Sequence, residues 1–471
     1  LDMASVNQLI VDTLFCEEER TMSLAKVLME KTNGIPLSLK EFLKSLYHKN
    51  LLSFNMEKGC WQWNLSKINL LKEVDSVSEI VSNKLERLSK RSHQILKLAS
   101  CIGNQFVSGV LAKVRKKTNA QTVSELQEAI QEGLILLVND NYKDELGEDE
   151  ESIVTYKFGD DHVQQTAYKS IPEEKKKEFN FKIGQSMLQD IPEENKDENI
   201  LDIVNRLNMG TQFIYRNDKK VELAELNLIA GKKAKSKSAY ESALDYFNTG
   251  ISLLGEDGWN TDYDLTIELY VEAVETAYLS NEFEQVNKLS ETVFQNAREL
   301  LDKVRVYEVN ILTDITQNQP EEALTTARTV LKLLGIKLLE RTNKLNIRRI
   351  FMHTKLTLTG KQVNDLIKLP KMTDPYKIAT MRILKSIHNI LNSYFPEMLP
   401  FEVFTRVDLS IKHGNGPGSL HAYADYGRIL CGFFEDIDSG YSFGMLALNM
   451  LETSNAKEVE ARIFLVFNMF I

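Results

Sequence analysis

The chain has 471 residues, which is long enough for several domains that each bury a core. Its hydrophobic fraction of 43% and charged fraction of 26% are typical of globular proteins in water, and its net charge of −10 argues against a general nucleic-acid or anionic-membrane binder. With only 22 glycines and 9 prolines, and no apolar run of about 18 residues, we expect a mainly α-helical fold without a transmembrane helix. The four widely spaced cysteines fit reduced thiols in the cytoplasm, and Cys101 lies in an apolar run typical of a core.

Residues 1–75 are predicted to contain helices and one hairpin. Apolar residues recur at helical spacing up to about residue 55, except at residues 32–36, where Asn33 and Gly34 end one helix and Pro36 begins the next. Residues 51–54 and 61–65 then flank a Glu-Lys-Gly turn, which predicts a small hairpin.

Residues 76–180 are predicted to form a winged helix. Four helical stretches precede two strands, at 134–138 and 153–158, and the acidic residues 144–151 between them are too charged to bury, so we expect a solvated hairpin tip. An acidic wing does not suit contact with phosphates, which favours an intramolecular docking domain over DNA binding. DNA binding stays open because Lys113, Arg115, Lys116 and Lys117 could meet a phosphate backbone.

The second strand runs into a helix that begins at Asp160 and Asp161, whose carboxylates can accept from the free amides of the first turn. Val163, Ala167 and Ile171 then recur four apart and are predicted to share one buried face. His162 stands beside the two carboxylates, and a capping cluster is expected there in preference to a catalytic dyad.

The remainder is helical almost throughout. Residues 181–335 show the small-residue and aromatic spacing of tetratricopeptide-like helix pairs, with Ala243, Val286 and Ala323 in equivalent places. A more basic helical connection, residues 336–375, includes Arg348 and Arg349, and further pairs are expected over residues 376–471. In the last of these, small residues at 422, 427 and 447 would let two helices approach closely.

Several motifs of known catalytic centres are missing from the sequence. They are the phosphate-binding loop GxxxxGK[ST], the kinase motif set, HExxH and paired CxxC. The seven histidines show no spacing typical of a metal site, and His413 and His421, on either side of a loop, are expected at the surface. We therefore predict no catalytic residue and no metal ligand in this chain.

Seven segments, in order, resemble one region of large signalling proteins of the STAND class of AAA-type ATPases. Among them, residues 61–68 (Trp-Gln-Trp-Asn-Leu-Ser-Lys-Ile) are similar to the family's Trp-x-Trp-Asp-Leu-x-x-Ile, and residues 163–168 match its Val-Gln-Gln-x-Ala-Tyr. Residues 202–208 resemble its Asp-Ile-Val-Asn-Gln-Leu-Asn, with Arg206 in place of the glutamine. The family joins a Ser/Thr-kinase-like domain, an AAA ATPase, a tetratricopeptide-like array, a GAF sensor and a histidine kinase. The resemblance implies that residues 1–75 are the lid helices of the ATPase.

The resemblance also implies roles for residues. Gly34 and Pro36 match the family's Gly-x-Pro turn, where the proline lies near the adenine base and senses the nucleotide, although an ordinary helix-breaking turn explains them equally well. ATP or ADP is expected in the full-length parent and not in this chain, which lacks the phosphate-binding loop. A contact between domains is expected at residues Asp160, Asp161, His162, Gln164 and Gln165.

We expect a regulatory and scaffold region of a multidomain ATPase-kinase, which couples nucleotide state to a helical array that binds neighbouring kinase or sensor domains or other proteins. Two alternatives stay open: a piece of a STAND-type transcription regulator, and a plain tetratricopeptide-like adaptor. The chain begins without methionine and both ends fall inside apparent helices, so a fragment of a longer polypeptide is expected.

Overall fold

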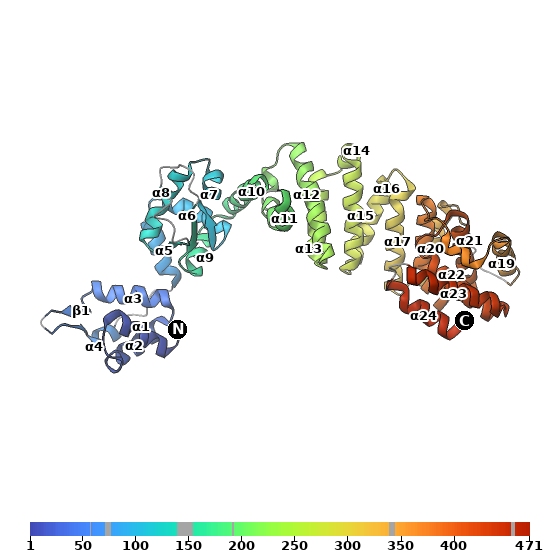
Figure 1. The fold of residues 1–471 in the computed structure, drawn as a ribbon. Coiled ribbons are helices and arrows are strands. Elements are labelled where there is room, and N and C mark those ends of the chain that lie inside the picture. The colour runs from blue at the N-terminus through green and yellow to red at the C-terminus, as the bar shows by residue number, and fades with distance from the viewer. Residues whose placement is uncertain (57, 71–76, 139–153, 191–192, 339–343, 454–456) are drawn as a thin grey trace. The chain divides into compact units, whose positions relative to one another are not determined.

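A computed structural model describes the chain except for residues 57, 71–76, 139–153, 191–192, 339–343 and 454–456. It confirms the expected mainly α-helical fold. The chain divides into two compact units, Leu1–Tyr215 and Arg216–Ile471 (Figure 1), and each is described by itself. Among the described residues, no helix combines the length and the apolar character needed to cross a membrane.

The first unit opens with three helices and the predicted hairpin. Its elements are α1 (Met3–Leu14), α2 (Glu18–Thr32), α3 (Pro36–His48), β1 (Leu52–Asn55), β2 (Cys60–Trp63) and α4 (Leu65–Asn69). The break between α2 and α3 lies where the sequence predicted it, because Asn33 and Gly34 both take positive φ (50° and 70°) and Pro36 is the first residue of α3. Strands β1 and β2 pair antiparallel, which confirms the hairpin.

Next come helices around a three-stranded antiparallel sheet of order β3-β5-β4. The elements are α5 (Val77–Arg87), α6 (Lys90–Ile102), β3 (Gln105–Val107), α7 (Ser108–Arg115), α8 (Asn119–Gln131), β4 (Ile135–Leu137) and β5 (Thr155–Phe158). The two predicted strands are present, but β3 was not predicted. Phe106 of β3 is buried and its ring stacks 5.7 Å from that of Tyr156 of β5. The predicted acidic hairpin tip lies outside the described residues.

Three helices complete the first unit: α9 (Asp161–Lys169), α10 (Glu173–Asp190) and α11 (Glu193–Asn208), before the short 3₁₀ turn η2 (Thr211–Phe213). The predicted cap of α9 is confirmed, since the Asp160 carboxylate accepts from the backbone N–H of His162 at 2.8 Å. Its predicted buried face is confirmed as well: Val163, Ala167 and Ile171 are all at most 3% exposed.

The second unit is helical apart from one isolated bridge among its described residues. Successive helices pack on each other, as α12 does on α13 and α17 on α18 (Figure 1). Its elements are α12 (Asn217–Ser236), α13 (Tyr240–Leu254), α14 (Gly258–Thr261), α15 (Tyr263–Leu279), α16 (Phe283–Asn296), α17 (Leu300–Thr316), α18 (Pro320–Leu333), α19 (Lys344–Leu358), η3 (Val363–Lys368), α20 (Pro375–Tyr394), η4 (Pro396–Met398), α21 (Leu399–His413), α22 (Ser419–Phe434), α23 (Ile437–Thr453) and α24 (Lys457–Phe470).

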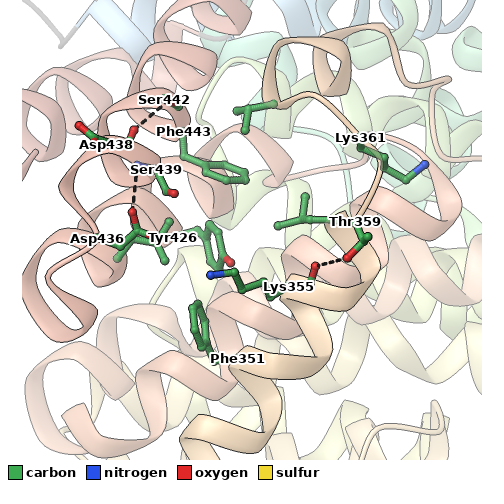
Figure 2. Close-up of a pocket in the computed structure, with 13 residues that line it drawn as sticks. Phe351, Lys355, Thr359, Lys361, Tyr426, Asp436, Asp438, Ser439, Ser442 and Phe443 are labelled. Carbon is green, nitrogen blue, oxygen red and sulfur yellow. Dashed lines mark hydrogen bonds between the residues drawn. The ribbon is translucent and has the colours of Figure 1, made fainter.

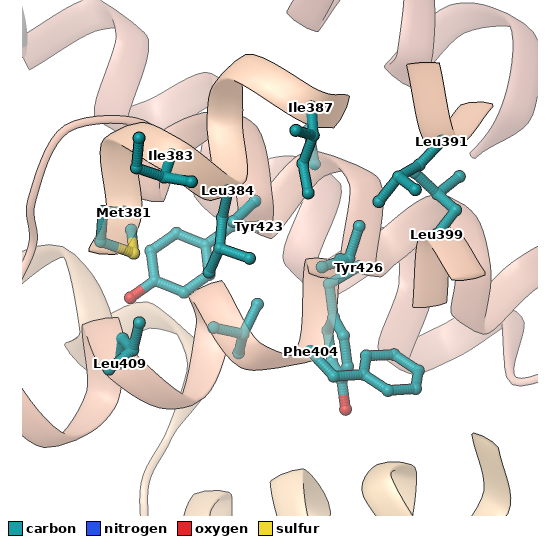
Figure 3. Close-up of a cluster of buried hydrophobic side chains, with 14 of the residues drawn as sticks. Met381, Ile383, Leu384, Ile387, Leu391, Leu399, Phe404, Leu409, Tyr423 and Tyr426 are labelled. Atoms are coloured by element: carbon teal, nitrogen blue, oxygen red, sulfur yellow. The ribbon is translucent and has the colours of Figure 1, made fainter. Parts of the chain in front are cut away.

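Helices α20, α21 and α22 share an apolar core, with Ile387 from α20, Phe404 from α21 and Tyr423 from α22 (Figure 3). Helix α22 also packs against α23 with little space between them, as the small residues predicted. A Cβ atom on Gly427 would lie 2.7 Å from the backbone oxygen of Gly440, which is closer than van der Waals contact permits.

Candidate functional site

The first candidate site is the C-terminal end of helix α6. The last four carbonyls of a helix lack partners within it and need donors from elsewhere. Gln164 of α9 donates its Nε2–H to the oxygen of Ser100 at 2.9 Å. Arg206 of α11 donates to the oxygens of Cys101 at 2.8 Å and Ile102 at 3.0 Å. Side chains from two other helices therefore satisfy the last three carbonyls of α6.

Arg206 is held in this position by two further contacts. Its Nη1 also donates to Asn180 Oδ1 of α10 at 3.2 Å, and its Nε donates to Asp202, one turn earlier on α11, at 3.1 Å. The side chain is 15% exposed. A cation at the carbonyl end of a helix is favourable because that end carries partial negative charge. Arg206 thus ties α6, α10 and α11 together.

The cysteine at this helix end is not a reactive group. Burial raises the pKa of the Cys101 thiol to about 11, so the thiol stays protonated near neutral pH. Its side chain is 7% exposed, which confirms the expectation that Cys101 belongs to the core.

The structure brings only one of the five predicted contact residues to the end of α6. That residue is Gln164, while Asp160 caps α9 and the Asp161 carboxylate accepts from Asn104 Nδ2 at 2.8 Å. His162 and Gln165 are exposed at the surface of the unit.

The Gly34 and Pro36 turn has a local explanation. Gly34 has φ of 70°, a conformation that favours glycine, and a Cβ atom there would lie 3.0 Å from the sulfur of Met29. Pro36 begins α3, where its missing N–H costs nothing. Their role toward a nucleotide stays a prediction.

The cations near α7 are largely paired within the unit. Lys113 lies 2.6 Å from Asp190, and both Arg115 and Lys117 form ion pairs with Glu125. Burial alone would raise the pKa of Glu125, but the hydrogen bonds from Lys117 and Arg115 outweigh it and lower that pKa. Three of the four cations that could meet a DNA backbone are thus engaged with carboxylates.

The second candidate site is a buried ionic network in the second unit. It joins His388 of α20, Glu402 and Arg406 of α21, and His421 and Asp425 of α22, all at most 4% exposed. Arg406 forms an ion pair with Glu402 and donates toward Nδ1 of His421 at 3.4 Å. Nδ1 of His388 lies 3.0 Å from both Arg406 Nη2 and Glu402 Oε2. The Nε2 atoms of both histidines lie 3.3 Å from Asp425 Oδ2.

Each buried carboxylate of this network has an arginine partner, and Arg462 adds a further positive charge nearby. The carboxylates of Glu402 and Asp425 face Arg406 and Arg428, whose Nη2 lies 3.4 Å from Asp425 Oδ1. Burial opposes ionisation of Glu402, yet Arg406 and then His388 keep its pKa below the ordinary value. Burial and then the charge of Arg406 lower the pKa of His421, which keeps that ring neutral. Buried charges are tolerated when paired in this way.

The donor set at first suggests a metal site, because His388, His421 and Asp425 offer three ligand atoms within 4.8 Å of one another. Arg406 argues against this reading. Since a guanidinium only donates, Nδ1 of His421 accepts from it, and the proton of that neutral ring lies on Nε2, toward Asp425. His421 Nε2 then faces Asp425 Oδ2 at 3.3 Å, without hydrogen-bond geometry. The network therefore fits an ionic clamp between α20, α21 and α22.

Neither the contacts of Arg206 with the end of α6 nor the buried ionic network was predicted from the sequence. The expectation of a surface position for His421 is wrong, because its side chain is buried between helices. The available signal was the spacing of four residues between Glu402 and Arg406 and between His421 and Asp425, which puts each pair on one helix face.

The chain is similar to regions of two histidine kinases. It is 24% identical over 520 aligned residues to the hybrid signal transduction histidine kinase G of Dictyostelium discoideum, an alignment that covers 96% of this chain and 15% of that protein. It is 23% identical over 300 residues to the peroxide stress-activated histidine kinase mak3 of Schizosaccharomyces pombe, covering 61% of this chain and 12% of that protein. No family model matches the sequence.

Among solved structures, a STAND protein with a tetratricopeptide repeat sensor from Pyrococcus horikoshii aligns with 99% of this chain and 56% of its own, at 12% identity and a TM-score of 0.37. A likeness at this TM-score supports no argument about fold or function. In sequence, the chain is similar over nearly its whole length to a region that makes up 15% of a hybrid signal transduction histidine kinase.

Proposed function

We propose that this chain is a regulatory region of a multidomain signalling kinase, in which the end of helix α6 transmits a change in the first unit to the helices that follow. The similarity to a histidine kinase over 96% of the chain carries this proposal. The chain spans about a seventh of that relative's length. We therefore propose kinase activity for a longer natural protein that contains this chain, and not for the chain itself.

In this proposal, residues 1–75 are the lid of an AAA-type ATPase and residues 76–180 a winged helix. The order helix, strand, helix, helix, strand, strand from α6 to β5, with its antiparallel sheet, supports the second assignment. Gly34 and Pro36 would sense ATP or ADP bound to a phosphate-binding loop elsewhere in the natural protein. The switch is a rigid-body rotation of the winged helix about the lid.

The hydrogen bonds at the end of α6 would transmit this rotation from α6 to α9 and α11. Arg206 makes hydrogen bonds to two carbonyls of α6, and bonds of this charge-assisted kind contribute about 1.5 to 3 kcal/mol each. When α6 moves, α11 therefore moves with it as long as those hydrogen bonds stay intact. The helical array of the second unit would then change its contacts with neighbouring kinase or sensor domains or with other proteins.

The alternatives make different predictions. A transcription regulator requires duplex binding by residues 76–180 with a steep salt dependence, and the ion pairs of Lys113, Arg115 and Lys117 disfavour that. A plain adaptor requires that deletion of residues 1–75 leaves partner binding unchanged.

The test is autophosphorylation of the natural protein that carries this chain, with Arg206→Met at the end of α6. We expect a change of several-fold in activity. Arg216→Met serves as the control, because that arginine is 76% exposed and its ion pair, in the part of the chain that the structure describes, is with Asp218. Equal activity of both variants and the parent would contradict the proposal, as would tight ATP binding by this chain alone.

A further inference from the structure

Helix α19 has one face in the core and one face in solvent. Ile347 and Thr354 are buried, with Phe351 partly buried beside them, and the helix packs on α21. His353 Nδ1 lies 2.7 Å from Asp408 Oδ2 of α21, which fixes the rotation of the helix about its axis. These contacts determine which residues of α19 face the solvent.

That solvent face carries an apolar stripe. Leu345, Met352 and Leu356 are 75%, 53% and 69% exposed, and their spacing of seven and four residues places them in one row along the helix. Single exposed apolar residues are common on protein surfaces. Here Met352 and Leu356 are one turn apart, and the exposed Arg349 lies between Leu345 and Met352, so the stripe is apolar with one cation within it.

Cations flank the stripe. Arg348, Arg349 and Lys355 are exposed, and none of them forms an ion pair with a carboxylate in the part of the chain that the structure describes. No acidic residue occurs between Glu340 and Asp365, in a chain whose net charge is −10. Among the described residues, these three cations therefore have no carboxylate partner, and their charge is concentrated on this helix.

A groove of about 420 Å³ lies between α19, α22 and α23, and Lys355 is among its lining residues (Figure 2). Its apolar wall includes Phe351, Tyr426 and Phe443. Lys355 extends past the rings of Phe351 and Tyr426, with its ammonium 5.7 Å from the centre of the Phe351 ring. An ammonium in this position can pair with a carboxylate while the aromatic wall receives an apolar side chain.

We propose that α19 and this groove form a docking site for an acidic amphipathic helix of a partner protein. Leucine-like side chains of the partner would cover the stripe and enter the groove, and its carboxylates would pair with Arg348, Arg349 and Lys355. The inference rests on the proposed function, because it names the class of protein that the helical array receives.

Charge distribution favours a protein over an anionic membrane as the occupant. Asp436 and Asp438, at the start of α23, line the groove across from α19, and a flat anionic surface on α19 would bring its phosphates toward them. A helix can place its carboxylates on the basic side alone. The Asp436 carboxylate also accepts from the Ser439 backbone N–H at 3.2 Å, so it stays on that side.

The probe is a fluorescein-labelled synthetic peptide of about 18 residues with leucine at helical spacing and glutamate elsewhere, measured by fluorescence anisotropy on the 471-residue chain. We expect saturable binding that weakens at least tenfold in Arg348→Glu/Lys355→Glu and in Met352→Gln/Leu356→Gln. The matched control is Lys288→Glu/Lys332→Glu, which reverses two exposed lysines on α16 and α18 and should change the affinity less than twofold. All six positions are exposed, so the fold is kept.

A scrambled peptide of the same composition separates docking from simple charge attraction and should bind at least tenfold more weakly. Equal affinity for the scrambled peptide, equal weakening in the control variant, or no binding at all would overturn the proposal. So would binding to phosphatidylserine vesicles, lost in the α19 variants, without binding to the peptide. These outcomes are independent of autophosphorylation in Arg206→Met, so the two proposals can fail separately.

Discussion

The substitution Arg206→Met tests the contact at the end of α6 in isolation. Methionine keeps much of the alkyl stem but removes the donors to Cys101 and Ile102. Cys101 is buried, so its carbonyl loses a charge-assisted hydrogen bond with little water to replace it, while Ile102 is partly exposed and can recover one. At about 1.5 to 3 kcal/mol for the first bond and less for the second, we expect a loss of about 2 to 3 kcal/mol.

Differential scanning calorimetry of the 471-residue chain measures this loss. For a unit of about this size, 2 to 3 kcal/mol lowers the melting temperature by roughly 5 to 10 °C. The transition of the unit Leu1–Tyr215 should move while that of Arg216–Ile471 stays, and Arg216→Met should change neither by more than about 1 °C. A shift as small as that of the control would show that Arg206 does not hold the helices together.

Three further predictions concern the second unit. Glu402→Gln leaves Arg406 buried without its carboxylate and should destabilise the unit by about 3 to 5 kcal/mol in urea unfolding, whereas a loss under 1 kcal/mol would refute the ionic clamp. The low pKa of His421 in the folded state means that only the unfolded state gains its proton as pH falls below about 6.5, so stability should drop by about 2 kcal/mol between pH 7.5 and 5, and His421→Gln should flatten that profile. Gly427→Ala should lower the melting temperature because its Cβ meets the neighbouring backbone at 2.7 Å, while Gly432→Ala on the same helix, with nothing within 4 Å, should not.

Local chemistry made part of the fold predictable. The cap at Asp160, the break before Pro36 and the buried row that includes Val163 and Ala167 depend on residues within one or two turns of each other, and all agree with the structure. Strand β3 was missed because three residues cannot show an alternating pattern, and its pairing is with β5, far along the chain.

The candidate sites depend on contacts between distant residues. Gln164 and Arg206 meet carbonyls 64 and 105 residues earlier in the chain, and no sequence pattern states which carbonyls at a helix end lack partners. The buried ionic network was missed for a related reason. Charged side chains are mostly exposed, so His421 was assigned to the surface, and only the packing of three helices shows the partners that make its burial tolerable.

The central claim is that the end of α6 passes a change in the first unit to the helices that follow. The most direct measurement is hydrogen exchange of the natural protein with ATP and with ADP, read at the amides of α6, α9 and α11. The proposal predicts that exchange changes in all three helices together, and that Arg206→Met confines the change to residues before α11. The claim would be contradicted if the nucleotide changed exchange only in residues 1–75 of the parent protein. It would also be contradicted if the nucleotide changed exchange nowhere in the 471 residues of this chain.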